Sequence, residues 1–215
     1  MRATQATPPT LALLLTLAVT ACYPPFAEMQ GARMTGPHKV EVTGFYSATT
    51  PHNEGESAEK LYNHYGAMIS AGISPSVDLR ARIERVAVDG EPDDAFTAIS
   101  VGPKFALKQD RVALFLPLGF ATGDAIEESK TFQFHPTLLF TLPVSKSFEL
   151  NPSVKALIPL SGDGGDVLVA ANLGAAFGPH ISRFAIRPEF GVLKNPSASG
   201  FVTHFSLGFS LGTGK

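Results

Sequence analysis

Residues 201–211 read FVTHFSLGFSL, and this stretch shows the pattern on which the fold depends. Large apolar side chains recur at alternate positions from Phe205 to Leu211, and only small or polar residues stand between them from His204 to Ser210. Successive side chains of a β-strand point to opposite faces of the sheet. The period of two therefore predicts a strand with one apolar face and one polar face.

The same alternation recurs along most of the chain. Its clearest form is VDLRARIE at residues 77–84, where apolar and charged residues alternate without exception. Most of the 16 phenylalanines fall on the apolar face of such segments. The pattern predicts about ten strands, at residues 40–46, 67–73, 77–84, 97–107, 112–120, 132–144, 148–160, 167–177, 184–192 and 201–211.

The connections between these segments alternate in length. Short turns are expected at residues 74–76, 108–110, 145–147 and 179–183, and longer polar loops at 47–65, 89–94, 122–131, 161–166 and 194–200. In an antiparallel meander, all short turns then lie at one end and all long loops at the other. Outer-membrane barrels have this asymmetry, with short periplasmic turns, and an even strand number places both termini in the periplasm.

The composition favours a membrane barrel over a soluble sheet. Only 17% of the residues are charged, and the second face of the strands carries many glycine, alanine and serine residues, which suit a narrow lumen. The predicted fold is an all-β, antiparallel, up-and-down transmembrane barrel. Six prolines within strands count against it because each removes a hydrogen-bond donor. The alternative is a periplasmic, lipid-anchored soluble β domain that binds an apolar ligand inside.

Two stretches resemble those of the small bacterial outer-membrane β-barrel proteins. Residues 72–82, GISPSVDLRAR, are similar to their strand-turn-strand units, and residues 206–211, SLGFSL, to their terminal-strand signal. The chain departs from that signal because it continues to Gly214 and Lys215 instead of stopping at an aromatic residue. The resemblance implies a location in the outer membrane, with membrane lipids and the barrel-assembly machinery as partners.

The N-terminus has the features of a secretion signal. Arg2 precedes an apolar run at residues 11–21 that is too short to span a bilayer as a helix. We expect a signal peptide at residues 1–21, a linker at 22–36 and the barrel at 37–215. Residues 19–22, VTAC, resemble a lipobox, and Cys22 is the single cysteine, which predicts lipidation at Cys22 in the inner leaflet. The alternative is ordinary cleavage after Ala21.

The polar face of the strands supplies the candidate functional residues. Both signs of charge occur there, so the first expectation is a network of ion pairs that fills the lumen. The alternative is a narrow polar path for a small solute, although about ten strands leave little open width. The predicted polar residues lining the lumen are Asp78, Arg80, Arg82, Glu84, Lys104, His135, Glu149, Lys155, Arg187, Glu189 and His204.

Other functional classes find little support in the sequence. His204 and Ser206 share a strand face, as in a serine hydrolase, but no hydrolase motif surrounds them, so no catalytic residue is predicted. The acidic loops at 89–94 and 162–166 lack the full spacing of a calcium loop. The sequence predicts no clustered basic surface, so we expect no nucleic-acid partner. We expect neither a metal nor a cofactor.

Overall fold

The computed structural model describes residues 26–52, 62–88, 91–123, 132–161 and 165–213. The expected signal peptide and Cys22 lie outside these residues. No helix in the described part of the chain is long and apolar enough to cross a membrane.

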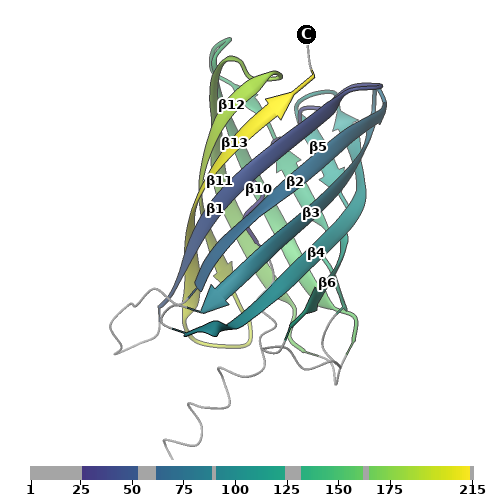
Figure 1. Cartoon of the computed structure of the whole chain (residues 1–215). Helices are drawn as coiled ribbons and strands as arrows, with labels where there is room; N and C mark the ends of the chain where they lie inside the picture. Colours follow the sequence, from purple (N-terminus) through teal and green to yellow (C-terminus); the bar gives the residue numbers. More distant parts are fainter. Residues whose placement is uncertain (1–25, 53–61, 89–90, 124–131, 162–164, 214–215) are drawn as a thin grey trace, which may run out of the picture.

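The described residues form a closed antiparallel β-barrel of ten strands (Figure 1). Two of the ten positions are interrupted: β5 and β6 share one, and β7, β8 and β9 share another. The elements are β1 (Val40–His52), β2 (Tyr62–Ser74), β3 (Val77–Val88), β4 (Glu91–Lys108), β5 (Val112–Phe115), β6 (Leu118–Thr122), β7 (Phe132–Phe134), β8 (Thr137–Phe140), β9 (Leu142–Pro143), β10 (Phe148–Pro159), β11 (Leu168–His180), β12 (Phe184–Lys194) and β13 (Phe201–Gly212).

The first and last strands close the barrel. β1 pairs with β13 in antiparallel register from Glu41↔Gly212 to His52↔Phe201. Each of the other strands pairs with its neighbours along the chain, so the meander predicted from the sequence is confirmed.

The connections divide the barrel into two ends. The turn end carries the short turns β2–β3, β4–β5, β9–β10 and β11–β12, and the loop end carries the connections β1–β2, β3–β4, β6–β7, β10–β11 and β12–β13 (Figure 1). One expected long loop is shorter than predicted, because β3 ends at Val88 and β4 begins at Glu91. The polar residues at 91–94 belong to the strand and not to a loop.

The prolines are accommodated in two ways. Pro117 falls between β5 and β6, and Pro136 between β7 and β8, so both lie at the interruptions of adjacent strand positions. The carbonyl of Pro117 still accepts a hydrogen bond from the His135 N–H, at 3.0 Å. Pro152 and Pro188 lie within β10 and β12 in regular register. The strands therefore break at Pro117 and Pro136 and continue through Pro152 and Pro188.

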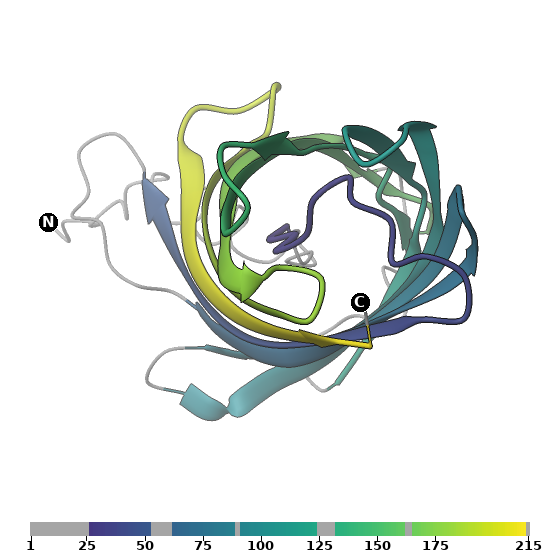
Figure 2. The ribbon, with the colours of Figure 1, turned by 90° about the horizontal axis from the view of Figure 1, so that it is seen from above.

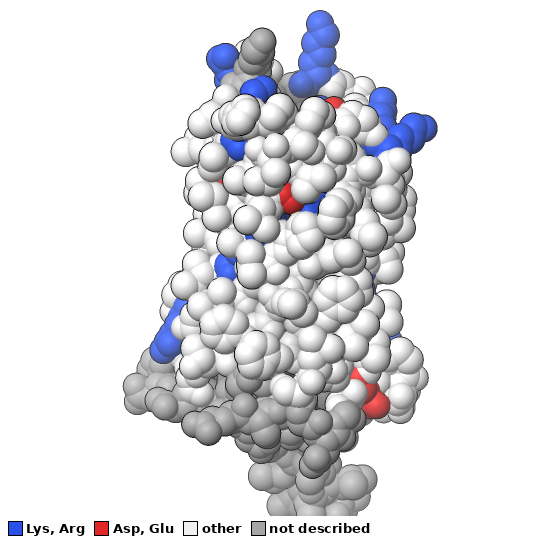
Figure 3. Space-filling model, turned by 90° about the vertical axis from the view of Figure 1, so that its right-hand side faces the viewer, with Lys and Arg blue, Asp and Glu red and all other residues white. Residues whose placement is uncertain are grey.

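The two faces of the sheet differ as the alternation predicts. Large apolar side chains on the outside are exposed, including Phe205 at 58% and Leu211 at 63%, whereas the alternate residues are buried. Few charged side chains reach the surface between the two ends on the face shown in Figure 3. The soluble alternative required the opposite arrangement, with apolar side chains inside and charges in water.

The segment before β1 lies inside the barrel. Residues 26–36 are within the ring of strands when the molecule is viewed from the turn end, instead of forming a linker outside it (Figure 2). Gly36, at φ +87°, begins the turn that leads out of the lumen into β1. The His38 N–H donates to the Gly72 carbonyl at 3.0 Å, which ties this turn to β2.

We predict that Gly72→Ala destabilises the barrel, because a Cβ at Gly72 would lie 1.7 Å from the carbonyl oxygen of Gly36. The free energy of unfolding by urea in detergent micelles should fall by about 1–3 kcal/mol, as for other overpacked sites. Gly44→Ala is the control, since a Cβ there meets no atom within 4 Å. Equal stability of the two variants would contradict the tight contact between the turn and β2.

Candidate functional site: the filled lumen

The N-terminal segment crosses the lumen from end to end. At the turn end, the Met34 N–H donates to Asp110 Oδ1 at 3.0 Å, and the Thr35 N–H donates to Asp78 Oδ2 at 3.0 Å. Asp110 lies in the β4–β5 turn and Asp78 near the start of β3. Phe26 lies among residues close to the loop end of β3, β4, β10 and β12. The segment therefore runs from the turn end at Thr35 to the loop end at Phe26.

Glu189 on β12 binds the middle of the segment. Its two carboxylate oxygens accept hydrogen bonds from the backbone N–H groups of Glu28, at 2.6 Å, and Met29, at 2.7 Å. Met29 has a left-handed backbone, at φ 45°, and consecutive N–H groups in such a conformation form a concave binding site for an anion. The buried carboxylate of Glu189 thus accepts hydrogen bonds from two backbone N–H groups that are not part of the sheet.

Two ion pairs connect the segment to the β10 wall. Lys155 pairs with Glu28, and Glu149 pairs with Arg33. Glu28, Lys155 and Glu149 are each less than 5% exposed. Leaving one partner of a buried pair alone is costly, so each pair favours keeping the segment in place.

Three further backbone groups of the segment are bound by side chains of the barrel wall. Arg82 donates to the Ala27 carbonyl, and Lys104 Nζ donates to the Arg33 carbonyl at 2.8 Å. The Ala32 N–H donates to Thr141 Oγ1 at 2.8 Å. Charged side chains from several strands converge on one extended segment, which therefore replaces water as their hydrogen-bonding partner.

An apolar cluster closes the loop end of the lumen. Phe26 is 2% exposed and packs with Val86, Phe96, Leu157 and Leu193. Its ring also meets His204 edge-on, with centroids 4.4 Å apart, and its carbonyl accepts a hydrogen bond from Asn172 Nδ2 at 2.8 Å. The segment is thus anchored by apolar packing at one end and by charge in the middle.

All eleven predicted lumen residues are buried. Some pair within the wall: Asp78 with Lys104 at 3.2 Å, Arg82 with Glu84, and Arg187 with Glu41 at 3.3 Å. Others contact the segment, as described for Glu149, Lys155 and Glu189. The sequence reasoning missed the segment as a partner. Residues 26–34, FAEMQGARM, hold one acid, one base, one glutamine and otherwise small or apolar residues, which is a composition suited to burial.

His204 and Ser206 do form a hydrogen-bonded chain. His204 Nδ1 lies 2.7 Å from Ser206 Oγ, and His204 Nε2 lies 3.1 Å from Asn172 Oδ1. Ser206 has no exposed surface, and its hydroxyl donates to Ser47 Oγ at 2.7 Å. A substrate carbonyl cannot reach Ser206 in this arrangement, so the chain serves to satisfy buried polar groups.

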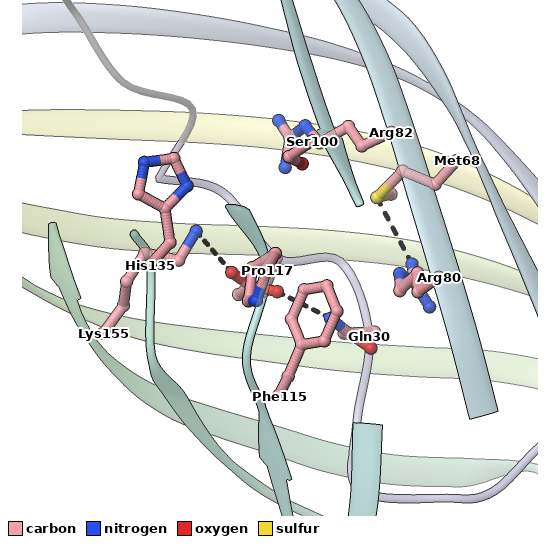
Figure 4. A pocket seen from close by; sticks show the side chains of 10 residues that line it. Gln30, Met68, Arg80, Arg82, Ser100, Phe115, Pro117, His135 and Lys155 are labelled. Carbon is pink, nitrogen blue, oxygen red and sulfur yellow. Dashed lines mark hydrogen bonds and ion pairs between the residues drawn. The ribbon is translucent and has the colours of Figure 1, made fainter. Parts of the chain in front are cut away.

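A small cavity lies beside the segment. A cavity of about 10 Å³ between the segment and the wall, roughly the room that one water molecule needs, is drawn in Figure 4. The side chains of Arg80, Arg82, His135 and Lys155 line it, and Arg80 contacts Met68 Sδ at 3.3 Å. Among the described residues, no group of three or more histidine, cysteine or acidic side chains could hold a metal ion.

No protein-family model and no curated protein matches the chain in sequence. Solved structures do match. Ail, the attachment invasion locus protein of Yersinia pestis, is 15% identical over 82% of this chain and 99% of its own, with a TM-score of 0.40. The translocator domain of the autotransporter NalP from Neisseria meningitidis is 11% identical over 94% of this chain and 95% of its own, at 0.46. The KdgM porin is 11% identical over 79% of this chain and 98% of its own, with a TM-score of 0.42.

The molecule's own geometry defines its class. The barrel is closed, its exterior is apolar and its interior is charged. Backbone groups in hydrocarbon must all be paired, which a closed barrel achieves. The closed barrel with its apolar exterior and charged interior is therefore of the transmembrane type.

We predict that Glu189→Ala releases the middle of the segment, because two backbone N–H groups lose their acceptor at about 1–3 kcal/mol each. Trypsin should then cleave after Arg33 in the folded barrel, while the wild-type protein resists. Glu189→Gln keeps one acceptor oxygen and should give intermediate cleavage. Resistance of both variants would show that the carboxylate does not hold the segment.

Proposed function

We propose that the protein is a structural or interaction component of the outer membrane whose barrel is closed by its own N-terminal segment. In this proposal the long loops face the cell exterior, a signal peptide directs export, and Cys22 is acylated. The single observation that carries the proposal is the filled lumen, in which residues 26–34 are buried apart from the half-buried Arg33.

The dimensions of the lumen support a closed state. Barrels with water-filled pores usually have about 16–18 strands, whereas this barrel has ten. The N-terminal segment occupies part of the space that remains, and ion pairs join Glu28 to Lys155, Arg33 to Glu149 and Asp78 to Lys104. The cavity beside the segment, at about 10 Å³, is too small for a hydrated ion.

A narrow channel is the second candidate, favoured by the way the segment is held. Side chains of the barrel wall bind the backbone of the segment, which is not paired with a strand as part of the sheet. These side chains include Asp78, Thr141, Asn172 and Glu189. The segment can therefore leave the lumen without opening the barrel wall. Its departure would expose a polar path to a small solute.

Planar-bilayer recordings test the proposed closed state. The wild-type protein should show no lasting conductance step, because the segment blocks the lumen. The double variant Phe26→Ser with Glu189→Ala should open stepwise, since both anchors are lost. Phe205→Ser, on the outer face, is the matched control and should stay closed. A steady ohmic conductance of the wild-type protein would overturn the proposal, and a folded double variant that stays closed would eliminate the channel alternative.

Acylation has its own test. Cells grown with an alkyne-bearing fatty acid should incorporate it into the wild-type protein and not into Cys22→Ala, because Cys22 is the single cysteine of the chain. Both proteins should remain in the membrane pellet, since the barrel spans the bilayer by itself. Equal incorporation into the two proteins, or none into either, would contradict acylation at Cys22.

A further inference from the structure

We infer that the lumen segment carries the N-terminus of the mature protein through the barrel to the loop end, so that Cys22 and the residues after it lie on the extracellular side. The inference rests on the proposed function for cleavage at Cys22 and for the orientation of the loops. It reverses the sequence-based expectation that the N-terminus lies in the periplasm.

The order of contacts along the segment gives the direction of travel. Thr35 contacts Asp78 at the turn end, Glu28 contacts Lys155 and Glu189 farther in, and Phe26 packs at the loop end against Val86. The contacts advance in one direction without reversal. Nine steps from Phe26 to Thr35 span at most about 32 Å, so the segment is long enough to cross most of the roughly 30 Å of the hydrocarbon core.

Chain length prevents Cys22 from returning to the turn end. Four steps separate Cys22 from Phe26, which allows a reach of at most about 14 Å, less than half the thickness of the hydrocarbon core. Phe26 is fixed by its apolar cluster and by the hydrogen bond from Asn172. An N-terminal amine or thioether at residue 22 therefore cannot reach the periplasmic leaflet while Phe26 stays in place.

The consequence is a lipid contact on the outer side. Acyl chains on Cys22 would enter the leaflet at the loop end, next to exposed aromatic side chains such as Phe120, Phe132 and Phe201. Burial of acyl chains is favourable by about 0.8 kcal/mol per CH₂. The acyl group would then anchor the segment at the loop end, while the turn at Gly36 anchors it at the turn end.

Cysteine labelling on intact cells tests this topology. Tyr23→Cys in the full chain is treated with a membrane-impermeant maleimide and compared with the wild-type protein, which reports any reactivity of Cys22 itself. Ser197→Cys, an exposed position in the β12–β13 loop, marks the loop end, and Lys146→Cys, in the β9–β10 turn, marks the turn end. Labelling after denaturation gives the total for each protein.

We expect Tyr23→Cys to label on intact cells to the same fraction as Ser197→Cys, while Lys146→Cys labels only after permeabilisation. Labelling of Tyr23→Cys only after permeabilisation, or only after denaturation, would overturn the inference. If Ser197→Cys and Lys146→Cys exchange behaviour, the proposed orientation fails instead. If the wild-type Cys22 labels on intact cells, acylation fails while the extracellular N-terminus stands.

Discussion

The structure depends on the requirement that every backbone N–H and C=O group in hydrocarbon be hydrogen-bonded. A sheet meets it only when its edges join, and here the join is the pairing of β1 with β13. Closure then determines the two faces. Apolar side chains face lipid, and every alternate residue points into an enclosed space that water fills poorly.

Because the lumen is enclosed, its charged side chains need partners, and the N-terminal segment supplies some of them. Charged residues such as Lys155, Glu149 and Glu189 are buried, and a buried charge is stable only with a partner. The wall supplies some partners, as in the Asp78–Lys104 pair. The segment supplies others through Glu28, Arg33 and its own backbone groups. The lumen is thus a folded core made of polar contacts, closed at the loop end by an apolar cluster around Phe26.

A core of this kind links structure to function. Side chains of the wall, and not the hydrogen bonds of the sheet, hold the segment in place. The course of the segment places Phe26 at the loop end of the barrel. The filling of the lumen therefore has one cause, the passage of residues 26–35 through it.

The sequence by itself determined the barrel. Period-two alternation, as in residues 77–84 and 201–211, depends on local strand geometry, so it revealed the strands, their apolar faces and the polar residues of the interior. It could not reveal the partners of those residues. Glu189 lies about 160 positions from Glu28 and Met29 in the chain, and no local pattern marks such a contact. Only the tertiary structure decided that residues 26–36 lie inside the lumen, because their place depends on closure of the whole barrel around them.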